Sequence, residues 1–178
     1  MKLLYSLLGL TIIIVACQPK ADNSAKEKFE KNSQTVIANL KGFENENIDY
    51  SHYADDFVFT DTGFGSKDSL NLSELKEMDK ASWTNYDFKL LTDPLVLLPG
   101  VNVDTKEFDG SVRYYGDWQV TLPATDSTEA RSGVLHFYEY FVFDDNGKIT
   151  QQGGYGDFGG LFGYLHGDDD HDDGEDMD

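Results

Sequence analysis

The feature that most constrains the fold is a long aromatic strand near the C-terminal end. Residues 133–143 carry apolar side chains in both phases of the two-residue strand period, so either face of this strand can line an interior. Residues 144–147 read Asp-Asp-Asn-Gly, which is typical of a tight hairpin turn, and residues 148–155 supply a returning strand. The pattern predicts an antiparallel hairpin.

Helical periodicity comes earlier in the chain. Residues 26–41 place apolar side chains on one helical face, and Gly42 follows as a C-cap. Asn47 is the expected cap of a short second helix, and Asn71 with Glu74 starts a third. Further strands are expected at residues 57–61, 86–90, 95–98, 112–115 and 118–122. Helices followed by antiparallel strands predict an α+β fold in one domain, residues 26–165.

The first 17 residues have the order of a secretory signal. Lys2 precedes an apolar stretch over residues 3–16, which is shorter than the roughly 20 residues of a membrane-spanning helix. Residues 14–17, Ile-Val-Ala-Cys, resemble the lipobox of bacterial lipoprotein signals. This resemblance implies cleavage before Cys17, lipid on its sulfur, and a place in the bacterial cell envelope, facing the periplasm or the exterior. Ordinary secretion is the alternative.

The two ends of the mature chain are expected to lie outside the domain. Residues 18–25 are a polar tether, and residues 166–178 form an acidic tail that lacks the apolar residues needed for folding. The tail lacks EF-hand spacing, so a specific calcium loop is not expected, although weak binding of divalent cations is left open. Cys17 is the sole cysteine, so neither a disulfide nor a thiolate metal site is expected. No cofactor is predicted.

Net charge excludes some partners. The chain carries −19 at neutral pH, and residues 18–165 alone carry −12, so the acidity is general. Nucleic acid and anionic lipid headgroups are both bound through basic patches, which argues against each as a partner. The expected membrane attachment is therefore the lipid on Cys17.

Two segments resemble one protein superfamily. Residues 53–61 (Tyr-Ala-Asp-Asp-Phe-Val-Phe-Thr-Asp) and residues 141–149, which contain the hairpin turn, are similar to segments of the nuclear-transport-factor-2-like superfamily. That superfamily includes ketosteroid isomerase and the SnoaL-like polyketide cyclases. The resemblance spans roughly residues 26–160 by element order. It implies a strongly bent antiparallel sheet wrapped over the N-terminal helices, forming a cone with a pocket at its mouth.

The resemblance also implies catalytic positions. Asp61 falls where the isomerases place a general base, and Glu139 where they place a carboxylic acid that donates to the substrate oxygen. Both carboxylates share the aromatic phase of their strands, where burial would raise a carboxyl pKa. The alternatives are that Asp61 caps the glycine-rich turn and that Glu139 is a hydrogen-bonded structural residue. The tyrosine that the isomerases also use is replaced by Ile37; Tyr50, Tyr53, Tyr138 and Tyr140 are its potential substitutes.

Other side chains are candidates for ligand contact or core packing. His136 is expected to be a satisfied strand histidine rather than a pocket acid, and the four histidines show no metal-ligand spacing. The segment 153–160, rich in glycine, is interpreted as a flexible close to the sheet. Either Gln151 or Gln152 points inward. The tentative ligand contacts are Tyr50, Tyr53, Phe59, Trp83, Trp118, Phe137, Phe141 and Gln152.

Three functions remain open on this basis. The first is a membrane-anchored SnoaL-like domain that binds a small apolar molecule. The second is a proton-transfer enzyme of the isomerase, cyclase or dehydratase type, with Asp61 as base and Glu139 as acid or oxyanion partner. The third is an envelope protein-interaction module, in which Val134, Tyr138 and Tyr140 on the outer sheet face dock a partner or form a homodimer.

Overall fold

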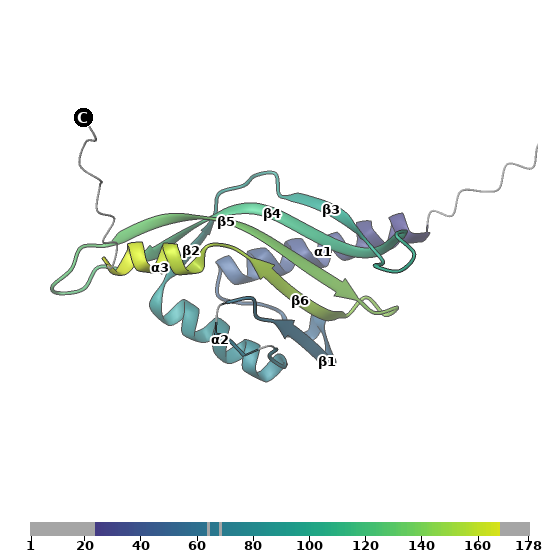
Figure 1. The fold of residues 1–178 in the computed structure, drawn as a ribbon, viewed down its shortest axis with the longest axis horizontal. Coiled ribbons are helices and arrows are strands. Elements are labelled where there is room, and N and C mark those ends of the chain that lie inside the picture. The colour runs from purple at the N-terminus through teal and green to yellow at the C-terminus, as the bar shows by residue number, and fades with distance from the viewer. Residues whose placement is uncertain (1–23, 64, 68, 168–178) are drawn as a thin grey trace, which may run out of the picture.

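The computed structural model describes residues 24–63, 65–67 and 69–167 (Figure 1). Within these ranges the helices are α1 (Ser24–Glu44), α2 (Leu72–Asn85), α3 (Phe158–His166) and the short 3₁₀ helix η1 (Tyr50–His52). The strands are β1 (Tyr53–Thr60), β2 (Asp87–Leu90), β3 (Val96–Val101), β4 (Phe108–Leu122), β5 (Arg131–Phe143) and β6 (Ile149–Tyr155). None of the helices in this part of the chain has the length and apolarity needed to span a bilayer.

The six strands form one mixed sheet in the order β1-β6-β5-β4-β2, with β3 also paired to β4. Figure 1 shows this sheet curving over α1 and α2. The β5–β6 hairpin and the α+β class are confirmed. Only one pairing departs from the expected antiparallel sheet: β1 lies parallel to β6. This follows from connectivity, because β1 enters the sheet long before β6 and joins it at the outer edge rather than through a hairpin.

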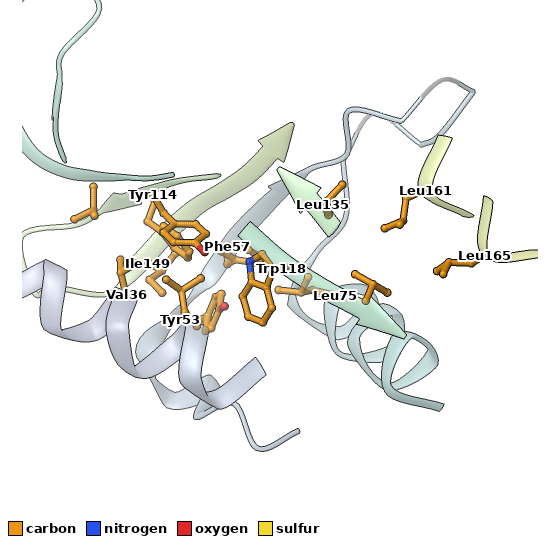
Figure 2. Close-up of a cluster of buried hydrophobic side chains, with 14 residues drawn as sticks. Val36, Tyr53, Phe57, Leu75, Tyr114, Trp118, Leu135, Ile149, Leu161 and Leu165 are labelled. Atoms are coloured by element: carbon orange, nitrogen blue, oxygen red, sulfur yellow. The ribbon is translucent and has the colours of Figure 1, made fainter. Parts of the chain in front are cut away.

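The core lies between the concave face of the sheet and the helices. Val36 on α1, Tyr114 on β4 and Phe141 on β5 are completely buried. Figure 2 shows Tyr53, Phe57 and Trp118 beside this group, with Leu161 and Leu165 extending the apolar cluster toward α3. Burial of these side chains supplies the main stabilisation, since the chain has no disulfide available.

Two expected boundaries were wrong. Helix α1 continues through Gly42 to Glu44, and Gly42 is buried where an added Cβ would lie 3.0 Å from the Ile48 Cα atom. Gly42 therefore permits a close backbone approach instead of ending the helix. The two strands expected within residues 112–122 are parts of one strand, β4. The Tyr114 side chain packs over Gly116, and this glycine continues the strand instead of ending it.

The glycine-rich segment is ordered rather than a flexible close. Gly153 and Gly154 are buried in β6, and α3 begins at Phe158. The Asp157 carboxylate caps α3 by accepting a hydrogen bond from the Gly160 backbone nitrogen at 2.9 Å. Leu161 and Leu165 then bury one face of the helix. Burial of this face outweighs the low helix propensity of three glycines in a nine-residue helix.

The remaining turns and ends refine the expected limits. Asp49, not Asn47, caps the short helix before β1. Asn71 and Glu74 form the expected capping box of α2. Helix α1 already begins at Ser24, and Gly167 ends α3 in the left-handed conformation. Cys17, residues 18–23 of the tether and residues 168–178 of the tail lie outside the described residues.

Candidate functional site

Glu139 is the central polar residue of the interior. It lies on β5 in the same phase as Leu135 and Phe141, and all three side chains are buried. Val134, in the opposite phase, is 51 % exposed. The aromatic phase containing Glu139 therefore faces the helices, and the phase containing Val134 faces outward, which resolves the ambiguity left by the sequence.

A chain of hydrogen bonds fixes the orientation of the Glu139 carboxyl. The Asn39 side-chain nitrogen donates to the Tyr53 hydroxyl at 2.7 Å, and that hydroxyl donates to Gln152 Oε1 at 2.9 Å. The Gln152 Nε2 atom in turn donates to Glu139 Oε1 at 2.7 Å. All four side chains are buried, and they come from α1, β1, β6 and β5. We call this set, Asn39, Tyr53, Gln152 and Glu139, the interior relay.

Burial raises the pKa of Glu139 to about 8, against the lowering effect of the Gln152 hydrogen bond; the nearby charge of Asp79 adds to the increase. The carboxyl is therefore mostly protonated at neutral pH. Because Gln152 donates to Oε1, that oxygen acts as the carbonyl, and the proton resides on Oε2. A neutral carboxyl in this state can donate a hydrogen bond to an acceptor atom.

A second buried carboxyl, Asp79 on α2, was not predicted from the sequence. It is 5 % exposed and accepts a hydrogen bond from the Tyr50 hydroxyl at 2.8 Å. Burial raises its pKa to about 6, although the Tyr50 bond opposes the increase. The sequence signal was its position four residues after Leu75, on the apolar face of the helix, where a charged residue is unusual.

Three buried side-chain polar atoms have no hydrogen-bond partner within the described residues: the Tyr114 hydroxyl, the Trp83 indole nitrogen and the Ser33 hydroxyl. Tyr114 on β4 is the register partner of Glu139 on β5, so the two side chains lie next to each other on the same face of the sheet. Burial raises the pKa of Tyr114, and the charge of Glu139 contributes to the increase. Buried polar atoms normally find a partner in protein, water or ligand. Tyr114 is thus an additional hydrogen-bonding group beside Glu139, which the sequence reasoning missed.

Asp61 makes no hydrogen bond or ion pair with the interior relay within the described residues. It follows β1, it is partly exposed, and its Oδ1 atom accepts a hydrogen bond from the Gly63 backbone nitrogen at 2.9 Å. This is the turn-capping arrangement weighed as the alternative. His136 is on the outer face, where its ring bonds Asp117 at 2.7 Å.

The predicted aromatic ligand contacts fall into three places around the interior. Trp83 and Trp118 both contact Phe43, each with ring centroids 5.6 Å apart. Phe59 and Phe141 are register partners of Gln152 on its two neighbouring strands. Phe137 instead packs against Phe158, which begins α3, at 5.5 Å. Of the potential substitutes for the missing tyrosine, only Tyr53 joins the interior relay; Tyr138 and Tyr140 are in the outward phase.

Solved structures share this fold. A candidate SnoaL-like polyketide cyclase from Shewanella denitrificans is 14 % identical with a TM-score of 0.55, covering 78 % of this chain and 98 % of its own. A nuclear-transport-factor-2-like protein from Burkholderia xenovorans is 13 % identical with a TM-score of 0.56, covering 76 % and 96 %. An LEH-like epoxide hydrolase from Mycobacterium tuberculosis is 17 % identical with a TM-score of 0.51, covering 77 % and 90 %. No family model and no curated protein matches the sequence.

The chain therefore has the SnoaL-like, nuclear-transport-factor-2-like fold, with helices held against a bent sheet that does not close. The fold implied by the resemblance of residues 53–61 and 141–149 is confirmed. Because a single fold serves many functions, the chemistry has to be argued from the interior relay and its neighbours.

Proposed function

We propose that this chain is a lipid-anchored envelope protein whose domain binds a small, mainly apolar molecule carrying a hydrogen-bond acceptor. The observation that carries the proposal is Glu139, a buried carboxyl that accepts a hydrogen bond from Gln152 within an aromatic interior. Burial raises its pKa to about 8, which keeps it mostly protonated at neutral pH. A buried carboxyl is costly unless its polar atoms are used, and an apolar site with a few oriented polar groups is the usual form of a small-molecule site.

Binding of the ketone acetylnaphthalene tests this proposal, because its carbonyl oxygen accepts hydrogen bonds and does not titrate. The affinity should fall several-fold as the pH rises from about 7 to about 9, since Glu139, with a pKa of about 8, loses the donated proton. Ethylnaphthalene, which lacks the oxygen, is the matched control and should bind independently of pH.

Substitutions of Glu139 test whether this residue, rather than another titrating group, causes the pH dependence of ketone binding. In Glu139→Gln the amide keeps a donor but cannot ionise, so ketone binding should persist and lose its dependence on pH. In Glu139→Met the preference for the ketone over the hydrocarbon should disappear. Identical pH profiles for ketone and hydrocarbon on the unsubstituted protein would contradict the proposal.

Proton transfer is a second candidate function, favoured by the two buried carboxyls. With a pKa of about 6, Asp79 is mainly ionised at neutral pH, whereas Glu139 is mainly protonated. Asp79 would take a proton from carbon next to a carbonyl, while Glu139 donates to the oxygen of the resulting enolate. The alternative base is Asp61, which the family resemblance implies.

Exchange of the acetylnaphthalene methyl protons with deuterium, followed by NMR, distinguishes these assignments. If Asp79 is the base, Asp79→Asn abolishes the exchange and Asp61→Asn leaves it unchanged; the reverse result assigns the base to Asp61. Binding of the ketone without any exchange would leave the domain a binding protein and exclude this enzymatic role for this class of ketone.

The outer sheet face supports the third function, protein interaction. Tyr115 and Tyr155 are 46 % and 59 % exposed, and both rings contact Tyr138 between them. Together with Val134 they form an exposed aromatic and apolar surface, the kind that docks proteins. For a homodimer through this face, Val134→Lys should convert a dimer to a monomer in sedimentation, and a monomeric unsubstituted protein would exclude that dimer.

A further inference from the structure

The first half of β5 has a strand neighbour on one side only. Its pairing with β4 runs from Arg131 onward, but its pairing with β6 begins at Tyr138. Residues 131–137 make no backbone hydrogen bonds to turns or loops within the described part of the chain. Alternate residues of an antiparallel strand direct their N–H and C=O groups to opposite sides. The outward groups of residues 131–137 are therefore an unpaired sheet edge.

An open groove of about 430 Å³ runs along this edge. Its lining comes from residues 132–136 of β5 and from Asp157, Leu161 and Tyr164 at the start of and within α3. After β6 the chain turns away beside His136 and enters α3, so α3 stands next to the edge without pairing with it. Gly133 has no side chain, and Leu161 occupies the space beside it. We call this feature the β5–α3 groove.

The β5–α3 groove has the dimensions of one extended strand. Five edge residues span roughly 17 Å at about 3.3 Å per residue, which corresponds to a strand of five or six residues. The α3 helix walls the far side, so a second β5 edge carrying its own α3 would meet this helix. A single peptide strand, in contrast, can use the backbone groups of β5 on one side and place alternate side chains against α3.

Charge defines the partner further. At one end of the groove, the Arg131 guanidinium makes a cation–π contact with Tyr164, 4.5 Å from the ring centroid. The Asp157 carboxylate lines the other part of the groove, and the surrounding domain is strongly acidic. A basic side chain on the incoming peptide complements Asp157. The eight acidic residues of the chain's own tail do not complement Asp157, because they carry charge of the same sign.

We propose that the β5–α3 groove binds an extended segment of another protein by strand addition to β5. The segment carries apolar side chains that alternate against Leu161 and Tyr164, and a lysine or arginine placed to meet Asp157. The groove is lined by residues outside the interior relay, so this interaction is independent of the ligand proposed for the interior.

The test uses residues 18–178 and a defined peptide probe. A seven-residue peptide of alternating valine and threonine, ending in arginine, is titrated to millimolar concentration while backbone amide NMR signals are recorded. We expect shifts concentrated in residues 131–137 and in α3, with slower hydrogen exchange at alternate amides of the edge. The matched probe is the same peptide with alternate amide nitrogens methylated, which should not bind because it cannot donate to a strand.

A charge variant tests the second half of the proposal. Asparagine is as good a helix cap as aspartate, so Asp157→Asn keeps α3 intact while removing the charge. It should weaken binding of the arginine peptide about two- to five-fold and leave unchanged the binding of a peptide whose arginine is replaced by glutamine.

Several results would overturn the proposal. These are the absence of shifts in residues 131–137 up to millimolar peptide, and equal binding of the methylated peptide. A change at the same amides on removal of residues 168–178, without peptide, would identify the tail as the occupant. Concentration-dependent protection of these amides in the free protein would identify a second copy.

Discussion

At the residue scale, the ionisation of Glu139 links domain stability to pH. Its pKa rises from 4.5 to about 8 on folding, chiefly through burial. The folded state therefore holds this proton more tightly than the unfolded state, so stability is greatest below pH 4.5 and falls until the pH passes about 8. The pKa of Asp79 rises from 3.8 to about 6 on folding, so Asp79 also lowers stability as the pH increases, but over a lower pH range than Glu139.

Glu139→Gln should remove the Glu139 part of this pH dependence. Between pH 6.5 and pH 8 the unsubstituted protein should lose on the order of 2 kcal/mol relative to the variant, since each unit of pH contributes about 1.4 kcal/mol in this window. Urea unfolding of both proteins at the two pH values measures the difference. Parallel curves for the two proteins would show that Glu139 ionises normally in the fold.

The Tyr53 hydroxyl links Asn39 to Gln152 within the interior relay. Tyr53→Phe removes the hydroxyl and leaves a donor on Asn39 and an acceptor on Gln152 buried without partners. The free energy of unfolding should fall by about 1–3 kcal/mol. Tyr86→Phe is the matched control: the Tyr86 hydroxyl bonds His166 in an exposed position, so its loss should cost less than about 1 kcal/mol. Equal losses in the two variants would argue against a relay.

Part of this site could be predicted from the sequence. Strand periodicity put Glu139 in the aromatic phase of its strand but left open which phase faces the interior. Tyr53 and Gln152 were named as ligand contacts, and the structure brings these two residues together with Glu139. Asn39 and Asp79 were missed because polar residues within amphipathic helices are usually assigned to the solvent face. Tyr114 was missed because an aromatic in a strand is normally counted as core, and its unpartnered hydroxyl becomes evident only in three dimensions.

At the scale of elements, the capping box of α2 makes a local prediction. The Asn71 side chain accepts hydrogen bonds from the backbone nitrogens of Ser73 and Glu74. Asn71→Ala should therefore lower the free energy of unfolding by about 1 kcal/mol. Ser73→Ala is the control, because only the Ser73 backbone takes part in the cap, and it should change stability by less than about 0.5 kcal/mol. Denaturant unfolding at neutral pH compares the two.

Helix α3 makes a stronger prediction, because the sequence suggested that this segment was flexible. Leu165 is 1 % exposed. Leu165→Ala should lower the free energy of unfolding by about 2–4 kcal/mol, because it removes buried apolar surface and leaves a cavity. His166→Ala, on an exposed residue of the same helix, should cost far less. A Leu165→Ala protein with unchanged thermal and denaturant stability would mean that α3 does not pack against the domain.

The elements also show where sequence reasoning stops. Period, caps and turn residues located α1, α2, β5 and β6, since each leaves a local pattern. The parallel pairing of β1 with β6 and the continuity of β4 depend on contacts between distant segments. For α3, the glycines predicted a loop, whereas burial of Leu161 and Leu165 against the sheet favours a helix.

At the scale of the whole molecule, the two sides of the sheet carry different features. The concave side holds the interior relay, the outer side carries exposed tyrosines, and the β5 edge opens beside α3. A ligand at the interior relay therefore does not compete with an added strand, whereas the outer face and the β5–α3 groove share Val134. Membrane attachment through Cys17 would leave all three regions accessible, because it precedes the domain by several residues of the expected tether.

The proposed attachment predicts how the whole protein distributes in the cell. The unsubstituted protein should sediment with membranes, enter solution only with detergent, and incorporate labelled palmitate. Cys17→Ala removes the lipid-accepting sulfur, and an acidic domain has little electrostatic attraction to anionic lipid, so this variant should lose the label. Where a signal peptidase still cleaves it, the variant should also enter the soluble envelope fraction.

Ser6→Ala, which keeps the length and apolarity of the leader, is the control and should behave as the unsubstituted protein does. Palmitate incorporation is decisive, because an uncleaved leader can retain a variant at the membrane without any acyl chain. An unlabelled, soluble unsubstituted protein would indicate ordinary secretion. An unsubstituted protein that is membrane-bound but unlabelled would show that the lipobox resemblance at residues 14–17 is misleading and that something other than a lipid holds the domain.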